Sequence, residues 1–296
     1  MTTAPADITS SYRPVAPPAE QETPGVVTVI EPKSGWAALD LREVWHYKDL
    51  LFTLASRDVK LRYRQTALGA VWVVLQPLIA AGIFSFVFGK VAKLPSDGVP
   101  YILFAYAGLL GWNAFNNTLT KASTCLVSNA QLVSKVYFPR LVLPLSTLGG
   151  TLIDFGVAFA VMAALMVFYR IVPHAGLLLL PVWLLLILLL AVGVGLFAAA
   201  LTVSYRDIQY VLPVLTQFVL YASPVAYAVS AVPIGLRPFF FLNPLSGVLD
   251  AFRWSLLGTG SLNVGAVGYS ALFGMVAFVC GAFAFRRMER RFADVI

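Results

Sequence analysis

The sequence predicts an all-α integral membrane protein with six transmembrane helices, an amphipathic interfacial helix near the N-terminus and short re-entrant helices before the last span. Of its 296 residues, 59% are hydrophobic and 12% are charged, and the mean hydropathy is +0.81. One soluble core could not bury so much apolar surface. Apolar runs of about 20 residues, the length that crosses a hydrocarbon layer of about 30 Å, recur along the chain. Lipid is therefore the expected solvent for most of it.

Six such runs define the predicted spans, which form one transmembrane domain at residues 67–296. They cover about 68–88, 99–119, 141–169, 177–203, 211–229 and 264–285. Only the third contains a charged residue, Asp154. A carboxyl group in a span is costly and often functional, but a buried polar group that hydrogen-bonds to neighbouring helices fits comparably well. The sequence leaves both interpretations of Asp154 open.

The basic residues, which give a net charge of +7, flank the spans and form no single patch or stripe of the kind that binds nucleic acid. Those on the richer side of the predicted membrane are Arg57, Lys60, Arg62, Arg64, Lys121, Lys135, Arg140, Arg286, Arg287, Arg290 and Arg291. Loops rich in Lys and Arg face the cytoplasm. We therefore expect a multi-pass protein of the cytoplasmic (inner) membrane with both termini in the cytoplasm, and no nucleic-acid partner.

The chain before the first span divides into two predicted segments. Residues 1–35 are polar and rich in Pro and Thr, which predicts a disordered cytoplasmic tail. Residues 36–66 are predicted to form an interfacial helix and a basic approach to the first span. From Asp40 to Ala55 apolar residues recur at helical spacing, and Asp40 with Glu43 fits a helix N-cap. An ordinary soluble amphipathic helix is the alternative.

Residues 230–262 are apolar but are interrupted by Pro and Gly, so no part of them can cross a membrane. Asn243 and Pro244 indicate the start of a helix, and Gly258 indicates its end. We expect a pair of half-inserted, re-entrant helices on the outer face. An ordered external loop is the alternative.

The chemistry of several enzyme classes is absent from the sequence. It has no Gly-x-x-x-x-Gly-Lys-Ser/Thr phosphate loop, no Asp-x-Asp, no His pair and no Cys cluster with metal-ligand spacing. We therefore expect no catalytic residue, metal or cofactor in this chain. The energy for any transport must come from another protein or from a gradient.

Several strings carry a family resemblance. They are RDVKLRYRQTALGAVWVVLQPL (57–78), PSDGVPY (95–101), LVSKVYFPRLVLPL (132–145), SYRDI (204–208), YASPVAY (221–227) and the terminal FADVI. Together they resemble the permease subunit of type-2 ATP-binding-cassette (ABC) transporters that export O-antigen, capsule or teichoic-acid-like polymers. The resemblance runs from about Trp36 onward and implies export of a lipid-linked polysaccharide, as in lipopolysaccharide biosynthesis. A type-2 exporter of small drugs or lipids, and a membrane-embedded enzyme of glycan assembly, are the alternatives.

The resemblance also implies a homodimer bound to two copies of a cytoplasmic ABC ATPase, which binds ATP and Mg. Gly149, Gly150, Gly193 and Gly195 would permit close helix approach in a dimer. The coupling loop of such permeases corresponds to residues 120–140. Candidate ATPase-coupling residues are Leu132, Val133, Lys135, Val136, Tyr137 and Arg140, with Arg206 and Asp207 in a second inner loop. The general enrichment of Lys and Arg in cytoplasmic loops, which orients membrane proteins, explains Lys135 and Arg140 equally well.

The basic run before the first span lies where a polyprenyl-diphosphate-linked glycan would place its headgroup. The candidate residues are Arg57, Lys60, Arg62 and Arg64. Guanidinium groups bind phosphate oxygens in bidentate fashion. Attraction to any anionic membrane lipid, about 1 kcal/mol per basic residue, would explain the same run without a specific site.

A glycan needs an enclosed, hydrated path, because unpaired polar groups in hydrocarbon cost several kcal/mol each. Aromatic rings suit such a path because they offer flat faces to sugar C–H groups. The conduit-lining candidates are Trp72, Phe84, Phe88, Tyr106, Trp112, Phe115 and Tyr221. Packing between helices and anchoring at the membrane interface are the alternative roles for each ring.

Overall fold

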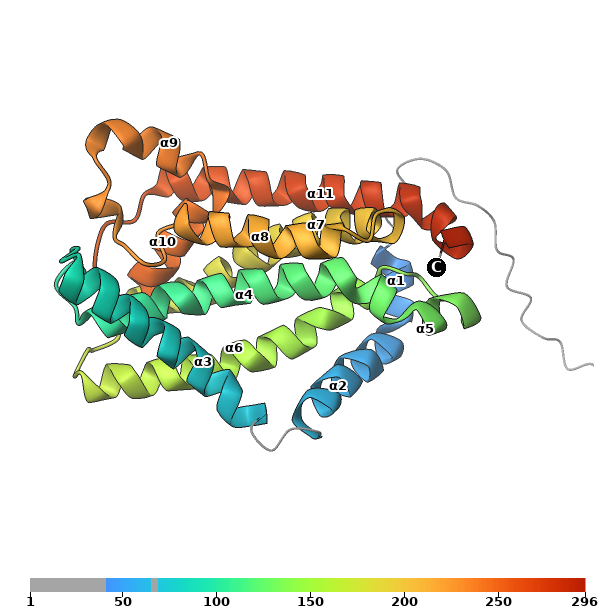
Figure 1. The fold of residues 1–296 in the computed structure, drawn as a ribbon, viewed down its shortest axis with the longest axis horizontal. Helices are drawn as coiled ribbons and strands as arrows, with labels where there is room; N and C mark the ends of the chain where they lie inside the picture. The colour runs from blue at the N-terminus through green and yellow to red at the C-terminus, as the bar shows by residue number, and fades with distance from the viewer. Residues whose placement is uncertain (1–40, 65–68, 296) are drawn as a thin grey trace, which may run out of the picture. The chain divides into compact units, whose positions relative to one another are not determined.

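A computed structural model describes residues 41–64 and 69–295, and within these residues every regular element is a helix (Figure 1). The predicted all-α membrane class is confirmed. The helices of the first half are α1 (Leu41–His46), α2 (Lys48–Arg64), α3 (Gly69–Phe84), the π-helix η2 (Ser85–Val91), α4 (Tyr101–Ser128), α5 (Ala130–Lys135) and α6 (Val142–Phe168). Those of the second half are η3 (Ala175–Leu179), α7 (Leu180–Ser204), α8 (Ile208–Tyr221), η4 (Val229–Ala231), η5 (Ile234–Leu236), α9 (Arg237–Phe241), α10 (Pro244–Leu257) and α11 (Val264–Val295).

Four helices in the described part of the chain are long and apolar enough to cross a membrane. They are Val71–Val91, Val142–Phe168, Ala175–Ser204 and Val264–Glu289, which match four of the six predicted spans. The apolar helix α8 has 14 residues, or about 21 Å at 1.5 Å per residue, and ends well before the predicted boundary at residue 229. The count of six spans stays a prediction.

Helix α4 covers the second predicted span and extends to Ser128, so the first part of the predicted loop at 120–140 is helical. It packs against α7, α6, α3 and α10 and lies between them in Figure 1. Protein surrounds it on most sides, and 18 of its 28 residues are buried. This position lets α4 carry several polar side chains, because neighbouring helices shield them from lipid.

Small residues set the closest helix contacts within the chain. A Cβ on Gly193 of α7 would collide with the backbone of Phe278 in α11, and one on Gly195 would lie 2.8 Å from Ala122 in α4. A Cβ on Gly149 of α6 would lie 2.7 Å from Ala55 in α2. These glycines, which the sequence offered for a dimer contact, therefore serve packing between helices of one chain.

The bundle has two ends, named here by the elements found there (Figure 1). The α5 end carries α1, α5 and the last turns of α11, whereas the α9 end carries η2, α9 and the start of α10. The predicted interfacial helix is two helices, α1 and α2, and α2 continues to Arg64 and packs against α6. The tail at 1–35 and the predicted cap Asp40 lie outside the described residues.

Helix α10 confirms the start and stop predicted for it. The Asn243 side chain accepts a hydrogen bond from the Leu245 N–H at 3.0 Å, Pro244 occupies the first turn, and Gly258 ends the helix with a φ of +68°. Such a positive φ favours glycine. α10 packs against α11, α4 and α7, and most of its residues are buried. It is therefore inserted into the bundle and does not lie on its surface.

Candidate functional site

One face of α4 is polar along its second half. Asn113, Asn117, Lys121, Thr124 and Ser128 are spaced by three or four residues, so they lie in one row on the helix. This row faces α2, α3 and α6, and its members line two cavities. We name these five residues the polar row of α4.

The two cavities lie one after the other along this row. The larger, of about 310 Å³, lies between α2, α4 and α6 towards the α5 end. The smaller, of about 90 Å³, lies between α3, α4 and α6, and Gln76, Asn113 and Asn117 contribute amide groups to it. Asp154 lines both. The cavities and the polar row form a polar seam where α4 meets α2, α3 and α6, and the row is half-buried except for the exposed Ser128.

Asp154 forms an ion pair with a neighbouring helix. Its Oδ2 lies 3.2 Å from Nζ of Lys121, and the Asp154 side chain is 8% exposed while that of Lys121 is 34% exposed. Removing either member would leave a charge without this partner in a largely buried site, which is strongly destabilising. The buried, bonded carboxyl that the sequence allowed is therefore observed. Asp154 lines both cavities, and its role in transport stays a prediction.

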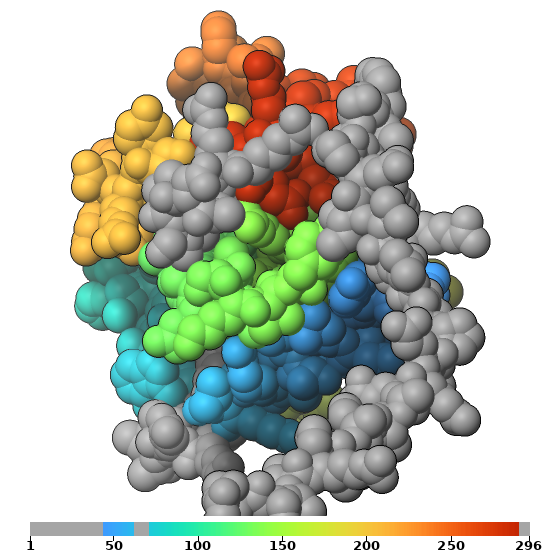
Figure 2. All heavy atoms as spheres, turned by 90° about the vertical axis from the view of Figure 1, so that its right-hand side faces the viewer, coloured from blue at the N-terminus to red at the C-terminus, as the bar shows by residue number. Residues whose placement is uncertain are grey.

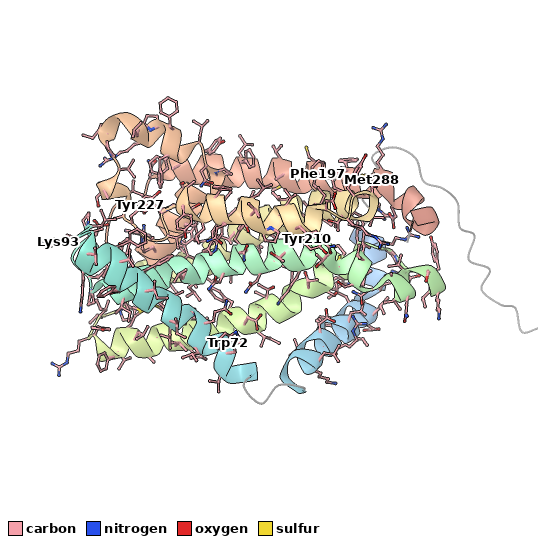
Figure 3. The ribbon with its side chains drawn as sticks, in the orientation of Figure 1. Trp72, Lys93, Phe197, Tyr210, Tyr227 and Met288 are labelled. Atoms are coloured by element: carbon pink, nitrogen blue, oxygen red, sulfur yellow. The ribbon has the colours of Figure 1, made fainter. Side chains whose placement is uncertain are left out.

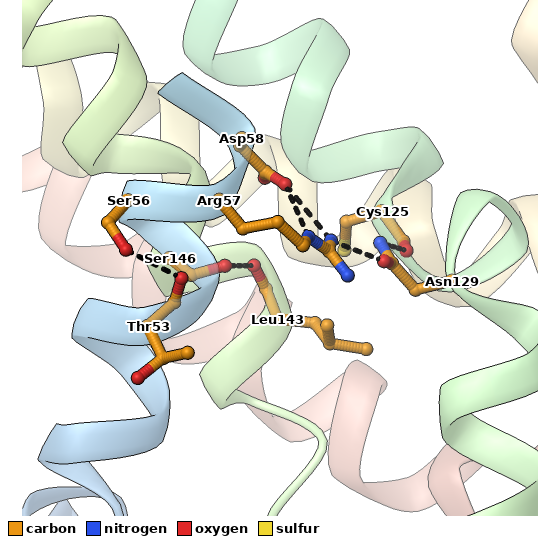
Figure 4. A network of polar contacts seen from close by, with 8 residues as sticks. All are labelled: Thr53, Ser56, Arg57, Asp58, Cys125, Asn129, Leu143 and Ser146. Atoms are coloured by element: carbon orange, nitrogen blue, oxygen red, sulfur yellow. Dashed lines mark hydrogen bonds and ion pairs between the residues drawn. The ribbon is translucent and has the colours of Figure 1, made fainter. Parts of the chain in front are cut away.

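Arg57 connects α2 to the end of α4 (Figure 4). Its Nη2 donates to Oδ1 of Asp58 at 3.0 Å and to Oδ1 of Asn129 at 2.7 Å, and Nδ2 of Asn129 donates to the carbonyl of Cys125 at 2.8 Å. Of the other predicted headgroup residues, Lys60 is exposed, and the side chains of Arg62 and Arg64 lie outside the described part. The structure thus places Arg57 among protein partners.

The segment from residue 129 to 140 presents a tip at the α5 end. Val136 and Tyr137 are 51% and 66% exposed, and Lys135 is also exposed. The two remaining predicted coupling residues of this helix point less outward: Val133 is buried in a core cluster, and Leu132 packs against it. Figure 2 shows this green surface between the blue surface of α2 and the red end of α11.

Arg140 anchors the segment to α11. Its backbone N–H donates to Oε1 of Glu289 at 3.3 Å, and its Nη1 donates to the Glu289 carbonyl at 2.6 Å. Arg206 and Asp207, between α7 and α8, are exposed. The segment therefore combines an exposed tip with hydrogen bonds to α11.

The predicted conduit aromatics fall into three groups. Tyr106, Trp112 and Phe115 are buried in the core at 1%, 4% and 5% exposure, where they pack between helices and line no open surface of the single chain. Trp72 on α3 and Tyr221 on α8 are more than half exposed, and Figure 3 shows Trp72 near the start of α3. The partly buried pair Phe84 and Phe88 is in edge-to-face contact, with ring centroids 5.5 Å apart.

Arg253 is a functional candidate that the sequence analysis did not single out. It is 3% exposed. Its Nη1 donates to the Pro224 carbonyl at 2.9 Å, its Nη2 lies 3.3 Å from Oδ1 of Asp250, and its guanidinium stacks 4.0 Å from the Phe104 ring. Burial lowers the pKa of Arg253 and raises that of Asp250, while their mutual attraction opposes both shifts. The cluster ties α10 to α4 and to the turn after α8.

Long apolar helices that pack beside a half-buried polar seam define a polytopic membrane protein of a kind suited to transport. The described residues contain no group of three or more His, Cys, Asp or Glu that could hold a metal ion. The chain belongs to the ABC-2 type transporter family, whose profile matches residues 49–257.

Similar curated proteins are named for O-antigen export or polysialic acid transport. The chain is 27% identical over 255 residues to the O-antigen export system permease protein RfbA of Klebsiella pneumoniae, covering 84% of this chain and 95% of that protein. It is 30% identical over 215 residues to RfbA of Myxococcus xanthus, covering 72% and 82%. It is 26% identical over 249 residues to the polysialic acid transport protein KpsM of Escherichia coli, covering 80% and 92%.

Proposed function

We propose that this chain is the membrane-spanning permease subunit of an ATP-driven exporter that carries a lipid-linked polysaccharide outward across the cytoplasmic membrane. The observation that carries the proposal is the similarity over most of the chain to permeases named for O-antigen and polysialic acid export. The polar seam along α4 supports it, because a hydrated solute needs polar groups at membrane depth.

A separate ABC ATPase supplies the energy in this proposal. The chain has no phosphate loop of its own, so ATP and Mg bind to the partner. The docking surface is the exposed tip with Lys135, Val136 and Tyr137, and Arg206 and Asp207 form a second contact. Movement of the ATPase would reach α11 through the Arg140–Glu289 contact and α2 through the Asn129–Arg57 contact.

A second copy of the chain completes the conduit. The faces of α3 and α8 carry large exposed apolar side chains, including Trp72 and Ile79 on α3 and Val214 and Phe218 on α8. Lipid or a second copy would cover them equally well in energy, since lipid tails are as apolar as Leu. In a glycan path enclosed between two copies, the exposed rings of Trp72 and Tyr221 would line the path and contact the sugar.

Deletion of the gene tests the function. Cells without the chain should keep the polymer inside the cytoplasmic membrane, and the cells should export it again when the chain and its ATPase are both restored. Restoring the chain with an ATPase that cannot hydrolyse ATP should give no export. Normal surface polymer in the deletion strain would contradict the proposal.

A further inference from the structure

The larger cavity contains both charged and neutral polar groups, contributed by three helices. Arg57 and Asp58 come from α2, Lys121 and Thr124 from α4, and Asp154 from α6. At about 310 Å³ it lies at the lower end of the range of small-molecule pockets, about 300–1,000 Å³. It is large enough to hold a ligand of the size of one sugar unit, and it lies inside one chain, away from the exposed α8 face.

The charges that line the cavity are balanced. Arg57 is held by Asp58 at 3.0 Å and Lys121 by Asp154 at 3.2 Å. Among the described side chains, two cations and two carboxylates give the lining no net charge. A phosphate would be attracted by the cations and repelled by the carboxylates at similar distances. Within the described residues, the cavity lining therefore shows no excess of positive charge of the kind that attracts an anion.

Balanced donors and acceptors suit hydroxyl groups. A sugar hydroxyl donates one hydrogen bond and accepts others, whereas a phosphate dianion only accepts. An ammonium group carries three donors, and the described contacts of Lys121 use one of them, to Asp154. Carboxylate acceptors beside that ammonium offer the pairing that adjacent hydroxyls of a sugar ring require. Hydroxyls of Thr124 and Ser128 also line the cavity.

We propose that the cavity between α2, α4 and α6 binds one neutral, hydroxyl-rich sugar unit, with the Lys121–Asp154 pair as its central recognition group. The inference rests on the proposed function, because it assigns a part of the exported glycan to a site within each single chain. It gives Asp154 a role at the boundary between the two cavities. Ligand binding here would also contact α2 and α4 together, next to the Arg57–Asn129 contact (Figure 4).

Protection of a thiol in the cavity tests the ligand class. The assay uses Ser128→Cys in a background without native thiols, Cys125→Ala and Cys280→Ala, because Cys125 also lines the cavity. It uses the full chain with its ATPase in lipid nanodiscs and follows the rate of modification by a charged methanethiosulfonate. The probes are the methyl glycosides of glucose, galactose, mannose and N-acetylglucosamine, and inorganic pyrophosphate. Ser134→Cys is the matched control, since Ser134 is exposed on α5 and does not line the cavity.

At least one glycoside should slow modification at position 128 about tenfold when present at about ten times its Kd, because few sites then stay empty. Pyrophosphate should not protect, and position 134 should be insensitive to every probe. Protection by pyrophosphate alone would show an anion site and overturn the proposal. A lack of protection by every glycoside would also overturn it.

Filling the cavity tests its use in export. A Cβ on Gly150 of α6 would meet Lys121 Nζ at 3.6 Å and Val59 at 4.0 Å, whereas Gly156 on the same helix has nothing within 4 Å. Gly150→Leu should therefore fill the cavity and reduce surface polymer to the level of cells without the ATPase. Gly156→Leu should export normally. Membrane levels and ATPase co-purification should match the wild type in both.

Three outcomes distinguish a failure of the proposed sugar site from a failure of the proposed export function. Normal export by Gly150→Leu would refute the cavity site while the wild type still exports, which leaves the proposed function intact. No polysaccharide export by the wild type would refute the proposed function itself. If Gly150→Leu failed to accumulate in the membrane, the thiol-protection result would decide the matter.

Discussion

Replacing Arg253 by Met tests how the α9 end is held together. The substitution keeps a long, unbranched side chain and removes the guanidinium group. It removes the hydrogen bond to the Pro224 carbonyl, the ion pair with Asp250 and the contact with the Phe104 ring. Breaking a buried pair from one side costs about 3–5 kcal/mol. The Asp250 side chain is 23% exposed, and water can partly solvate its carboxylate. We therefore expect the lower end, about 3 kcal/mol.

The loss can be measured as the temperature at which detergent-purified protein loses its monodisperse peak in size-exclusion chromatography. At about 2–4 °C per kcal/mol for a chain of 150–250 residues or somewhat more, the midpoint should fall by roughly 6–12 °C. Arg170→Met is the control, because Arg170 is exposed at the same end, and exposed positions change stability by about 0.5 kcal/mol or less. Adding Asp250→Asn to Arg253→Met should recover part of the loss.

Two results would refute a stabilising role for the buried Arg253–Asp250 pair. One is the same unfolding temperature for Arg253→Met and Arg170→Met. The other is a further fall of the midpoint when Asp250→Asn is added to Arg253→Met. The first result would mean that the buried guanidinium contributes nothing measurable. The second would mean that Asp250 is stabilised by groups other than Arg253.

Three further sets of substitutions test the docking tip, the α7–α11 packing and the Lys121–Asp154 pair. Lys135→Glu combined with Tyr137→Ala should reduce surface polymer while membrane levels stay normal, because both side chains are exposed at the proposed docking tip; undiminished polymer would remove this surface from the coupling site. Gly193→Ala should destabilise the protein by about 1–3 kcal/mol, since its Cβ would collide with α11. The control Gly268→Ala, with open space around it, should be neutral or slightly stabilising. Equal thermal midpoints for the two variants would argue against close α7–α11 packing. Lys121→Met should lower the thermal midpoint more than the double variant Lys121→Met, Asp154→Leu does, because the single change leaves a buried carboxylate without the lysine. A double variant less stable than either single variant would contradict this coupling between Lys121 and Asp154.

Local signals predicted much of the fold. The apolar runs gave four of the membrane-length helices, because twenty apolar residues have few other stable arrangements. The Asn243–Pro244 start and the Gly258 stop of α10 were predicted correctly, because a helix cap depends on neighbours within a few residues. The end of α8 at Tyr221 was not, since the apolar composition continues beyond it and a turn there depends on tertiary contacts.

The sequence predicted the polar seam only in part. The spacing of the polar row on α4 is present in the sequence. The apolar run that predicted this span ends at residue 119, however, so Lys121 was assigned to a loop. Asp154 stood out as a charge in a span, but its partner lies 33 residues away on another helix. Arg253 was not singled out, because its partners Pro224 and Phe104 lie far from it in the sequence. One sequence does not show which distant residues meet, and the Lys121–Asp154 pair and these two Arg253 contacts depend on that. Asp250, by contrast, is three residues from Arg253 on the same helix.

Reconstitution tests the central claim, that this chain provides the path and another protein the energy. Vesicles should be prepared with the purified chain alone, with the chain and its ATPase, and with the chain and an ATPase unable to hydrolyse ATP, each loaded with lipid-linked polysaccharide on the ATPase side. The account predicts polymer transfer in the second preparation when ATP is added and in neither of the others. Transfer by the chain alone would contradict it.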